Sequence, residues 1–215
     1  MQKQPHNIRE TLDLLNIQYK SFVDVKKYAE KYGHPHPSDT KAWSQIIISA
    51  LTGIKGIKRK KGPDFNDGSD VKGANTWGAI DTPRFNSCIK AGTKSSISGK
   101  MESLDEMPYL FFVLWDYEPS TKRERCRIWV VRPQKDTVFR SICKHWYRNR
   151  SSGEIVSDNF QLHPPRQKNS DIIRNTCGNL KYPLLFSAVR GKDGFEVQHY
   201  KASIMIRGQC KTSSE

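Results

Sequence analysis

The chain has 215 residues, which is long enough for one large domain or two small ones with a substantial core. It carries 36 Lys and Arg against 22 Asp and Glu, a formal net charge of +14, yet 36% of its residues are hydrophobic, which excludes a disordered polycation. No apolar run is long enough to span a membrane, and the five widely spaced cysteines exclude a disulfide framework. With no signal pattern at its start, we expect a cytoplasmic protein.

Apolar residues at helical spacing predict two helices in the N-terminal part of the chain. The first covers residues 8–32 and stops at Gly33; the second covers 41–53, with Ser38 or Asp39 as its cap and Gly53 as its end. A basic run and the turn Gly62-Pro63 follow. From residue 68 the pattern changes to strand-like pieces at 69–74, 76–80 and 84–90.

The second half of the chain predicts a sheet with one more long helix. Residues 108–117 are the most apolar stretch and predict a buried central strand, which should pair with a strand at 125–133. A helix is expected over 136–150 with Asp136 or Thr137 as its cap, then a loop at 159–169, a short helix at 170–178 and a hairpin of 182–190 with 195–202. These elements predict an α/β (α+β) fold in a single domain of residues 1–215, with a helical N-terminal part at 1–53 and a core at 62–215.

The positive charge is concentrated in two windows. Residues 55–61 hold five basic residues and no acid, and residues 120–150 hold ten basic residues and two acids. Together they supply +13 of the net +14. Clustered cations among aromatic residues suit a polyanion, so nucleic acid is the first candidate partner and the windows are expected to form the walls of a cleft for it. The alternative is a plain basic surface.

Residues 62–75, GPDFNDGSDVKGAN, have the composition of a metal-dependent phosphodiesterase site. On a strand, Asp70 and Lys72 project to the same side while Val71 points into the core. The Asn, Asp and Gly residues of the intervening turn can bring Asp64 back to the same place. Carboxylates are the hard ligands that Mg²⁺ prefers, and a lysine can position the attacking water and offset charge on the phosphate. The competing interpretation is an ordinary exposed turn.

The pattern P-D-x5-D-x-K resembles the PD-(D/E)xK nuclease signature, and residues 68–86 resemble type II restriction endonucleases, within which they are similar to the MamI type. The resemblance assigns Asp64, Asp70 and Lys72 as the catalytic residues, with Asp64 and Asp70 as metal ligands and Asp67 as a rival to Asp64. It implies a mixed central sheet flanked by helices, Mg²⁺ dependence, and cleavage of double-stranded DNA that leaves 5′-phosphates, usually by a homodimer. Such folds often add an acid from a preceding helix, where this chain offers Gln45.

Two loops and the first basic window supply candidate DNA-binding residues. Arginine reads guanine and Asn or Gln reads adenine, so we expect base contacts from the loop after the catalytic strand and from the loop at 159–169. The basic window should contact phosphates, which position a protein without specifying sequence. The candidates are Asn75, Arg84 and Asn86 in the first loop, Arg166, Gln167 and Lys168 in the second, and Lys58, Arg59, Lys60 and Lys61 in the window. A plain surface is the alternative for the second loop.

The sequence therefore predicts a Mg²⁺-dependent, sequence-specific DNA endonuclease, whose host would carry a cognate DNA methyltransferase. Two alternatives stay open: a non-catalytic basic DNA-binding protein whose D-x-K is incidental, and a MutH-like repair endonuclease that nicks one strand.

Overall fold

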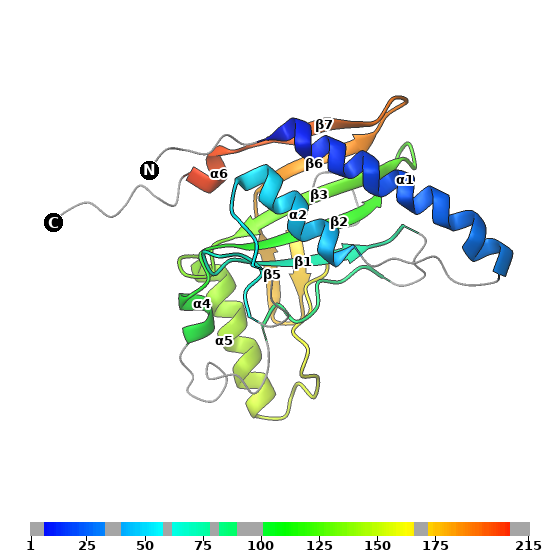
Figure 1. Ribbon diagram of the computed structural model, residues 1–215. Helices are drawn as coiled ribbons and strands as arrows, with labels where there is room; N and C mark the ends of the chain where they lie inside the picture. The colour runs from blue at the N-terminus through cyan, green and yellow to red at the C-terminus, as the bar shows by residue number, and fades with distance from the viewer. Residues whose placement is uncertain are drawn as a thin grey trace.

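The computed structural model describes residues 7–32, 40–57, 62–77, 82–89, 101–165 and 172–206 (Figure 1). Its helices are α1 (Ile8–Tyr32), α2 (Lys41–Thr52), α4 (Glu102–Asp105), α5 (Thr137–Ser151) and α6 (Ser203–Ile206). Its strands are β1 (Asp70–Asn75), β2 (Leu110–Tyr117), β3 (Glu124–Val131), β4 (Ile172–Asn175), β5 (Gly178–Lys181), β6 (Leu184–Arg190) and β7 (Phe195–Tyr200).

Five strands form the main sheet in the order β1-β2-β3-β6-β7, and β4 pairs with β5 in a separate two-stranded sheet. β1 is parallel to β2, and every other pair of the main sheet is antiparallel. The predicted mixed sheet flanked by helices is confirmed. The predicted pairing of residues 125–133 with the apolar strand is also confirmed, as is the C-terminal hairpin.

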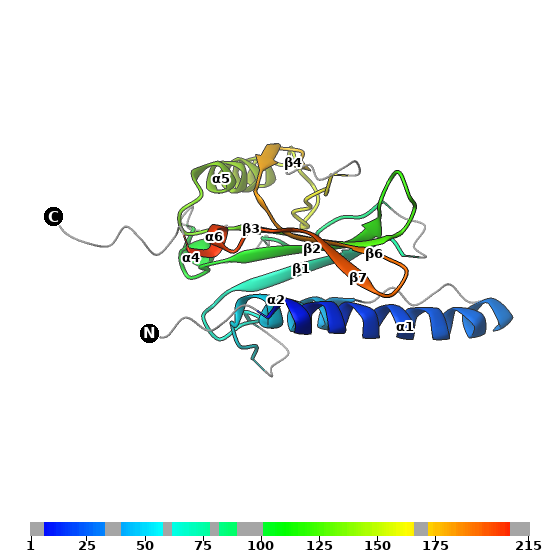
Figure 2. The same cartoon turned by 90° about the horizontal axis from the view of Figure 1, so that it is seen from above.

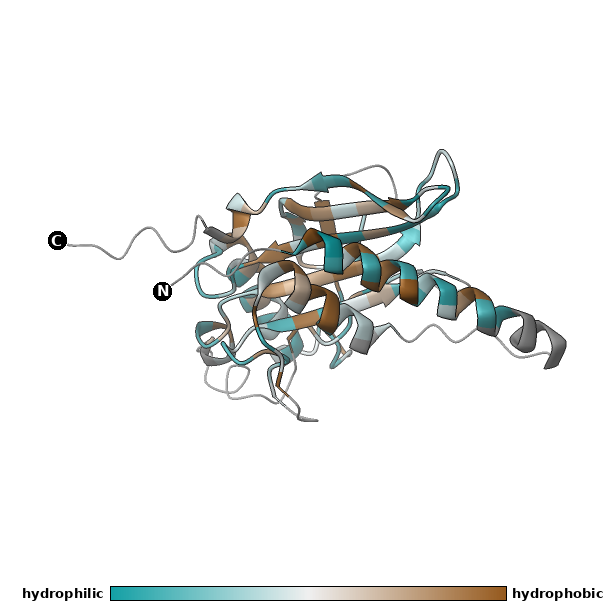
Figure 3. Cartoon of the chain, turned by 45° about the horizontal axis from the view of Figure 1, so that its top comes forward, coloured by the Kyte–Doolittle hydropathy of each residue, from teal (hydrophilic) through white to brown (hydrophobic). Residues whose placement is uncertain are grey.

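Helices cover both faces of the main sheet, which explains why β2 is apolar on both sides. Successive residues of a strand face opposite ways, so Phe111 and Val113 pack in one core cluster with α1 and α2, while Leu110 and Phe112 pack in the other with α5. Figure 2 shows these layers, with α1 and α2 on one side of the sheet and α5 and β4 on the other. In Figure 3, α1 alternates hydrophobic and hydrophilic residues, as a helix with one buried face does.

The N-terminal helices and α5 lie where the sequence predicts them. α2 ends at Gly53 in a left-handed conformation, but its N-cap is Thr40 and not Ser38 or Asp39, which lie outside the described residues. Asp136 caps α5 as predicted, because its carboxylate accepts a hydrogen bond from the Phe139 N–H at 2.9 Å. Within the described residues, no helix has the length and hydropathy needed to cross a membrane.

Two local predictions are wrong. The short helix predicted at 170–178 is not found over its described residues, because Ile172–Asn175 is strand β4, in which Ile173 is buried between two exposed neighbours. This alternation has the period of a strand, and the turn to β5 is closed by the Asn175 side chain, which accepts the Cys177 N–H at 2.8 Å. The described residues of the two strand-like pieces after β1 form no strand either: Trp77 lies in a turn, and Phe85 makes one isolated bridge to Leu162, whereas residues 78–80 and 90 lie outside the described part of the chain.

Candidate active site

Asp70 and Lys72 lie at the start of β1, an edge strand of the main sheet. The pleat turns both side chains to one face, where the Lys72 ammonium contacts the Asp70 carboxylate at 2.6 Å. The two side chains keep 16% and 20% of their surface exposed, so the pair is open to a ligand. Val71 between them is buried in the core, as the sequence predicts.

A tight turn brings Asp64 to the same place. The chain reverses over residues 65–69 with hydrogen bonds from Phe65 N–H to the Ser69 carbonyl (3.1 Å) and from Gly68 N–H to the Phe65 carbonyl (3.2 Å). Gly68 has a φ of +91°, and a Cβ there would lie 2.6 Å from the Glu106 carbonyl oxygen, so only glycine fits. Phe65 is fully buried and anchors the turn in the core.

The Asp64 carboxylate is held by both the strand and α2. Its Oδ2 accepts the backbone N–H of Val71 at 3.1 Å, and its Oδ1 accepts the side-chain amide of Gln45 at 2.6 Å. Asp64 and Asp70 also share a hydrogen bond. Asp67, the rival candidate, is exposed and accepts the N–H and hydroxyl of Ser69 at 2.9 and 3.0 Å. The structure thus brings Asp64 against Asp70, whereas Asp67 closes the turn.

The two carboxylates have opposite pKa shifts. Burial, the shared hydrogen bond and the Asp70 charge raise the pKa of Asp64 to about 7. Burial acts to raise the pKa of Asp70 as well, but the hydrogen bond from Asp64 and the charge of Lys72 outweigh it, and the pKa of Asp70 is lowered. Two adjacent carboxylates repel, so a single lysine is too little cation for both to ionise near neutral pH. A metal ion bound at this pair would supply positive charge to both carboxylates.

The donor set suits Mg²⁺ better than a softer metal. Within the described residues, no group of three or more His, Cys, Asp and Glu side chains lies close enough together to hold an ion. Mg²⁺ keeps several waters and needs only one or two protein carboxylates together with substrate phosphates. Asp64 and Asp70 would meet that requirement, and the pKa of Asp64 is raised by burial and by the neighbouring Asp70 carboxylate.

Comparison with known proteins identifies a family over most of the chain. A family model described as "MamI restriction endonuclease" matches residues 27–190, a range that includes α2, β1 and all three candidate catalytic residues. The chain belongs to the MamI restriction endonuclease family. A curated relative, "Type II restriction enzyme MamI" of Microbacterium ammoniaphilum, is 28% identical over 209 residues, covering 85% of this chain and 67% of the relative. No solved structure matches the chain.

Membership of the MamI restriction endonuclease family confirms the predicted resemblance and the predicted enzyme class, a type II site-specific deoxyribonuclease. Membership also identifies DNA as the partner of this basic chain, since an endonuclease of this class acts on DNA.

The candidate DNA-reading residues that the structure describes hold parts of the fold together. The side-chain Oδ1 of Asn75 accepts the Trp77 N–H at 2.7 Å, and the side-chain Oδ1 of Asn86 accepts the side-chain amide of Asn159 at 3.2 Å. Arg84 is half-buried. The remaining candidates lie outside the described residues: Lys58, Arg59, Lys60, Lys61, Arg166, Gln167 and Lys168.

The two predicted reading loops are joined to each other, which the sequence did not indicate. Phe85 and Leu162 exchange two backbone hydrogen bonds of 2.8 and 3.0 Å, and the Ser87 N–H donates to the Asn159 side chain at 2.7 Å. His163 exchanges a further pair with Arg174 of β4. Segments 82–89 and 159–165 therefore form one unit packed beside β4 and β5.

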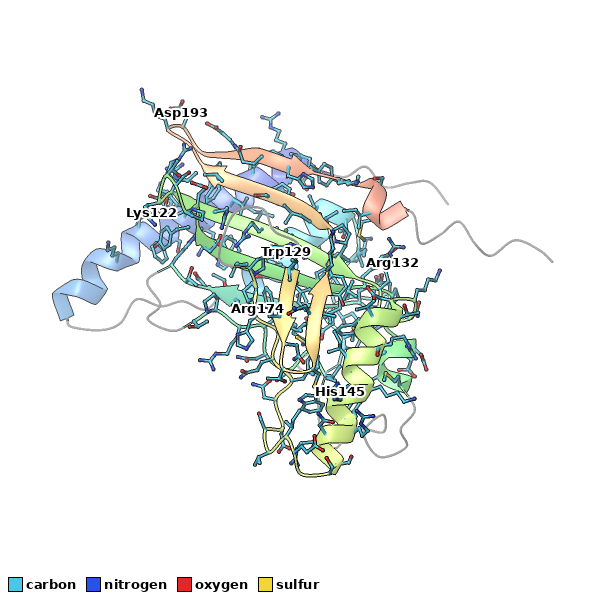
Figure 4. The ribbon with its side chains drawn as sticks, turned by 180° about the vertical axis from the view of Figure 1, so that it is seen from behind. Lys122, Trp129, Arg132, His145, Arg174 and Asp193 are labelled. Atoms are coloured by element: carbon cyan, nitrogen blue, oxygen red, sulfur yellow. The ribbon has the colours of Figure 1, made fainter. Side chains whose placement is uncertain are left out.

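The second basic window does not form a single cleft wall. Arg125 and Arg127 are 1% and 0% exposed, and both donate to the buried carboxylate of Asp116. Other members lie apart: the exposed Lys122 lies at one end of the sheet and the half-buried Arg132 at the other (Figure 4). The prediction failed because charge counted along a strand includes side chains from both faces and both ends of the sheet.

Gln45 is the functional candidate that sequence reasoning left without a role. Where folds of this kind often add an acid from a preceding helix, α2 contributes an amide that donates to Asp64. A signal was present: Gln45 is a long polar side chain directly before the apolar run Ile46–Ile48 of α2. A polar residue kept among apolar ones on a packed helix usually has a buried partner.

Proposed function

We propose that this chain cleaves double-stranded DNA in a Mg²⁺-dependent reaction that leaves 5′-phosphate ends, with Asp64, Asp70 and Lys72 as its catalytic residues. The observation that carries the proposal is the convergence of these three side chains at the start of β1, within the range that matches the family.

Each side chain has a distinct part in the proposed reaction. Asp64 and Asp70 supply the oxygen ligands for the metal, which when bound polarises the scissile phosphate and lowers the pKa of a bound water. Lys72 orients the attacking water and places its ammonium where negative charge grows on the phosphate oxygens. The Asp70 carboxylate at 2.6 Å fixes the position of that ammonium. Water adds to phosphorus, the bond to the 3′ oxygen breaks, and the products are a 5′-phosphate and a 3′-hydroxyl.

The proposal extends to partners. Type II enzymes commonly read palindromic sites as homodimers, so we propose a homodimer and a cognate methyltransferase that protects the host DNA. We also propose base contacts from Asn75, Arg84, Asn86, Arg166, Gln167 and Lys168, and phosphate contacts from Lys58 to Lys61. The side-chain amides of Asn75, Asn86 and Gln167 suit the edge of adenine, and the cationic groups of Arg84, Arg166 and Lys168 suit the edge of guanine.

Incubation of plasmid DNA with the protein and Mg²⁺ tests the cleavage directly. We expect discrete linear fragments whose ends ligate without prior phosphorylation, because a ligase requires a 5′-phosphate. The D70N variant should bind the plasmid and leave it intact. Open circles alone would indicate a nicking enzyme, and binding without any product would indicate a non-catalytic DNA-binding protein. Sequencing of the ends would give the recognition site and the stagger.

A further inference from the structure

A groove of about 250 Å³ opens at the corner where β3 leads into α5. Three cationic side chains line it, Arg132, Lys135 and Lys181, together with the single carboxylate of Asp136. Its remaining walls are Val130, Val131, Tyr182, Pro183 and Ile204. None of these residues takes part in the site described above.

The charge of the groove favours an anion. Three cations face one carboxylate, and that carboxylate accepts the Phe139 N–H as the cap of α5. Lys135 and Lys181 are exposed, so their ammonium groups can reach a ligand in the groove. The first turn of α5 adds the partial positive charge of a helix N-terminus. A phosphate is the anion that such a set of donors suits.

The corner is rigid because α6 ties two strands together. The Arg132 guanidinium, just after β3, donates to the Ile204 carbonyl at 2.7 Å. The Tyr109 hydroxyl, just before β2, donates to the adjacent Met205 carbonyl at 3.0 Å. Arg132 is therefore held in place before any ligand arrives, which reduces the entropy lost on binding.

The groove lies at the same end of the sheet as the catalytic residues. Asp70 pairs with Leu110, and Leu110 pairs with Val131, so one row across three strands leads from the catalytic carboxylate to the wall of the groove. This row crosses two inter-strand spacings of about 4.8 Å, so the backbone of Val131 lies roughly 10 Å from that of Asp70. Since one strand of a DNA duplex carries a phosphate about every 3.4 Å along its axis, the groove lies within about three phosphates of the site.

We propose that this groove binds a backbone phosphate of the DNA, about three phosphates from the bond that is cut. The inference rests on the proposed function for its ligand, but it concerns binding and not cleavage. Its contribution is affinity and register, because phosphate contacts position a protein without specifying sequence.

The test compares two double variants that remove the same charge from opposite ends of the sheet. K135Q/K181Q removes two cations from the groove, and K122Q/K192Q removes two from the β2–β3 and β6–β7 turns, at the end marked by Lys122 and Asp193 in Figure 4. Affinity for a fluorescent DNA duplex is measured by anisotropy between 50 and 300 mM salt, without metal, so that cleavage does not interfere. Thermal unfolding checks that each variant folds.

The groove variant should bind the duplex about 10- to 100-fold more weakly near 0.1 M salt, and its plot of log K against log salt should be shallower by about 2. K122Q/K192Q should match the wild type, and K135R/K181R should restore the wild-type slope. Equal slopes for K135Q/K181Q and the wild type would overturn the proposal. So would an equal loss in the two double variants, since that would reflect net charge alone.

Once the cleavage site is mapped, replacing single DNA phosphates with uncharged analogues locates the phosphate that the groove contacts. Methylphosphonates are placed singly along the duplex, and binding is measured for the wild type and K135Q/K181Q. One to three positions near the cut should weaken the wild type and leave the variant unaffected; sensitivity confined to positions more than half a helical turn away would contradict the placement. If the wild type cleaves DNA and the salt slope of K135Q/K181Q is unchanged, only the phosphate-binding role of the groove is refuted. If that slope changes and the wild type gives no cleavage in Mg²⁺, only the proposed nuclease function is refuted.

Discussion

Asp70 at the start of β1 and Asp116 near the end of β2 both hold a carboxylate against basic side chains, in opposite surroundings. Asp116 is 7% exposed and accepts from Arg125 at 2.9 and 2.7 Å and from Arg127 at 2.6 Å. Arg127 also donates to the Pro165 carbonyl at 2.6 Å. Asp70 is more exposed, shares a hydrogen bond with Asp64 and has one lysine beside it.

The balance of charge separates the two clusters. Around Asp116 two cations face one acid, and the arginine forks satisfy the carboxylate within the core. Around Asp70 two acids face one cation, which leaves a deficit that a metal ion can fill. Acidic and basic residues thus hold the sheet to the segment at 159–165 around Asp116, whereas around Asp70 they make a candidate catalytic site.

Replacing Asp70 with asparagine should have the largest effect on activity. Asparagine keeps the shape but loses the charge that binds the metal, so cleavage should fall by at least about 1,000-fold while stability changes by less than about 1 kcal/mol. Single-turnover cleavage in Mg²⁺ and urea unfolding of the same preparation measure the two quantities. A variant that cuts at the wild-type rate would remove Asp70 from the reaction.

Replacing Asp116 with asparagine should have the opposite outcome. Two buried guanidinium groups would lose their counterion, and the free energy of unfolding should drop by about 3–5 kcal/mol. Asp158→Asn is the matched control, because Asp158 pairs with Arg150 but its side chain is 75% exposed; its cost should be below about 1 kcal/mol. Equal losses in the two variants, measured by urea unfolding, would show that burial does not distinguish these pairs.

Removing the amide that orients Asp64 should have an intermediate effect. Gln45→Ala takes away the donor at 2.6 Å, and we expect metal affinity and cleavage to fall by about 10- to 100-fold. Ile46→Ala on the same helix is the control, since Ile46 is 51% exposed and should not affect either quantity. Calorimetric titration with Mg²⁺ gives the affinity. If the two alanine variants behave alike, Gln45 has no positioning role.

The pH dependence of metal binding should show the smallest effect. Because the pKa of Asp64 is raised to about 7, a proton competes with the metal below that pH, and Mg²⁺ affinity should rise about tenfold per pH unit up to 7 and level off above it. Asp70 adds no slope in this range, since its pKa is lowered. Titrations from pH 5.5 to 8.0 measure the slope. Asp64→Asn should remove it; a slope that persists in that variant would belong to another group.

The strands and long helices could be predicted because their patterns are local. The apolar run of β2, the helical spacing of α1 and the cap of α5 are each signals contained within a few neighbouring residues or turns. Each of these elements lies where the sequence predicts it. Residues 170–178 could not be assigned, because a stretch with two adjacent isoleucines fits either period until the partner strand β5 is known.

The candidate site likewise has a part that local sequence predicts and a part that depends on the tertiary structure. The sequence by itself determined that Asp70 and Lys72 share a face, because strand period fixes it, and that the turn at 65–69 could return Asp64 to them. Only the tertiary structure decided that Gln45 of α2 donates to Asp64, and that the charges of Arg125 and Arg127 are enclosed with Asp116. It also brought Arg132, Lys135 and Lys181 to the catalytic end of the sheet. These contacts join residues distant in the chain, and a sequence pattern does not record which of them fold against each other.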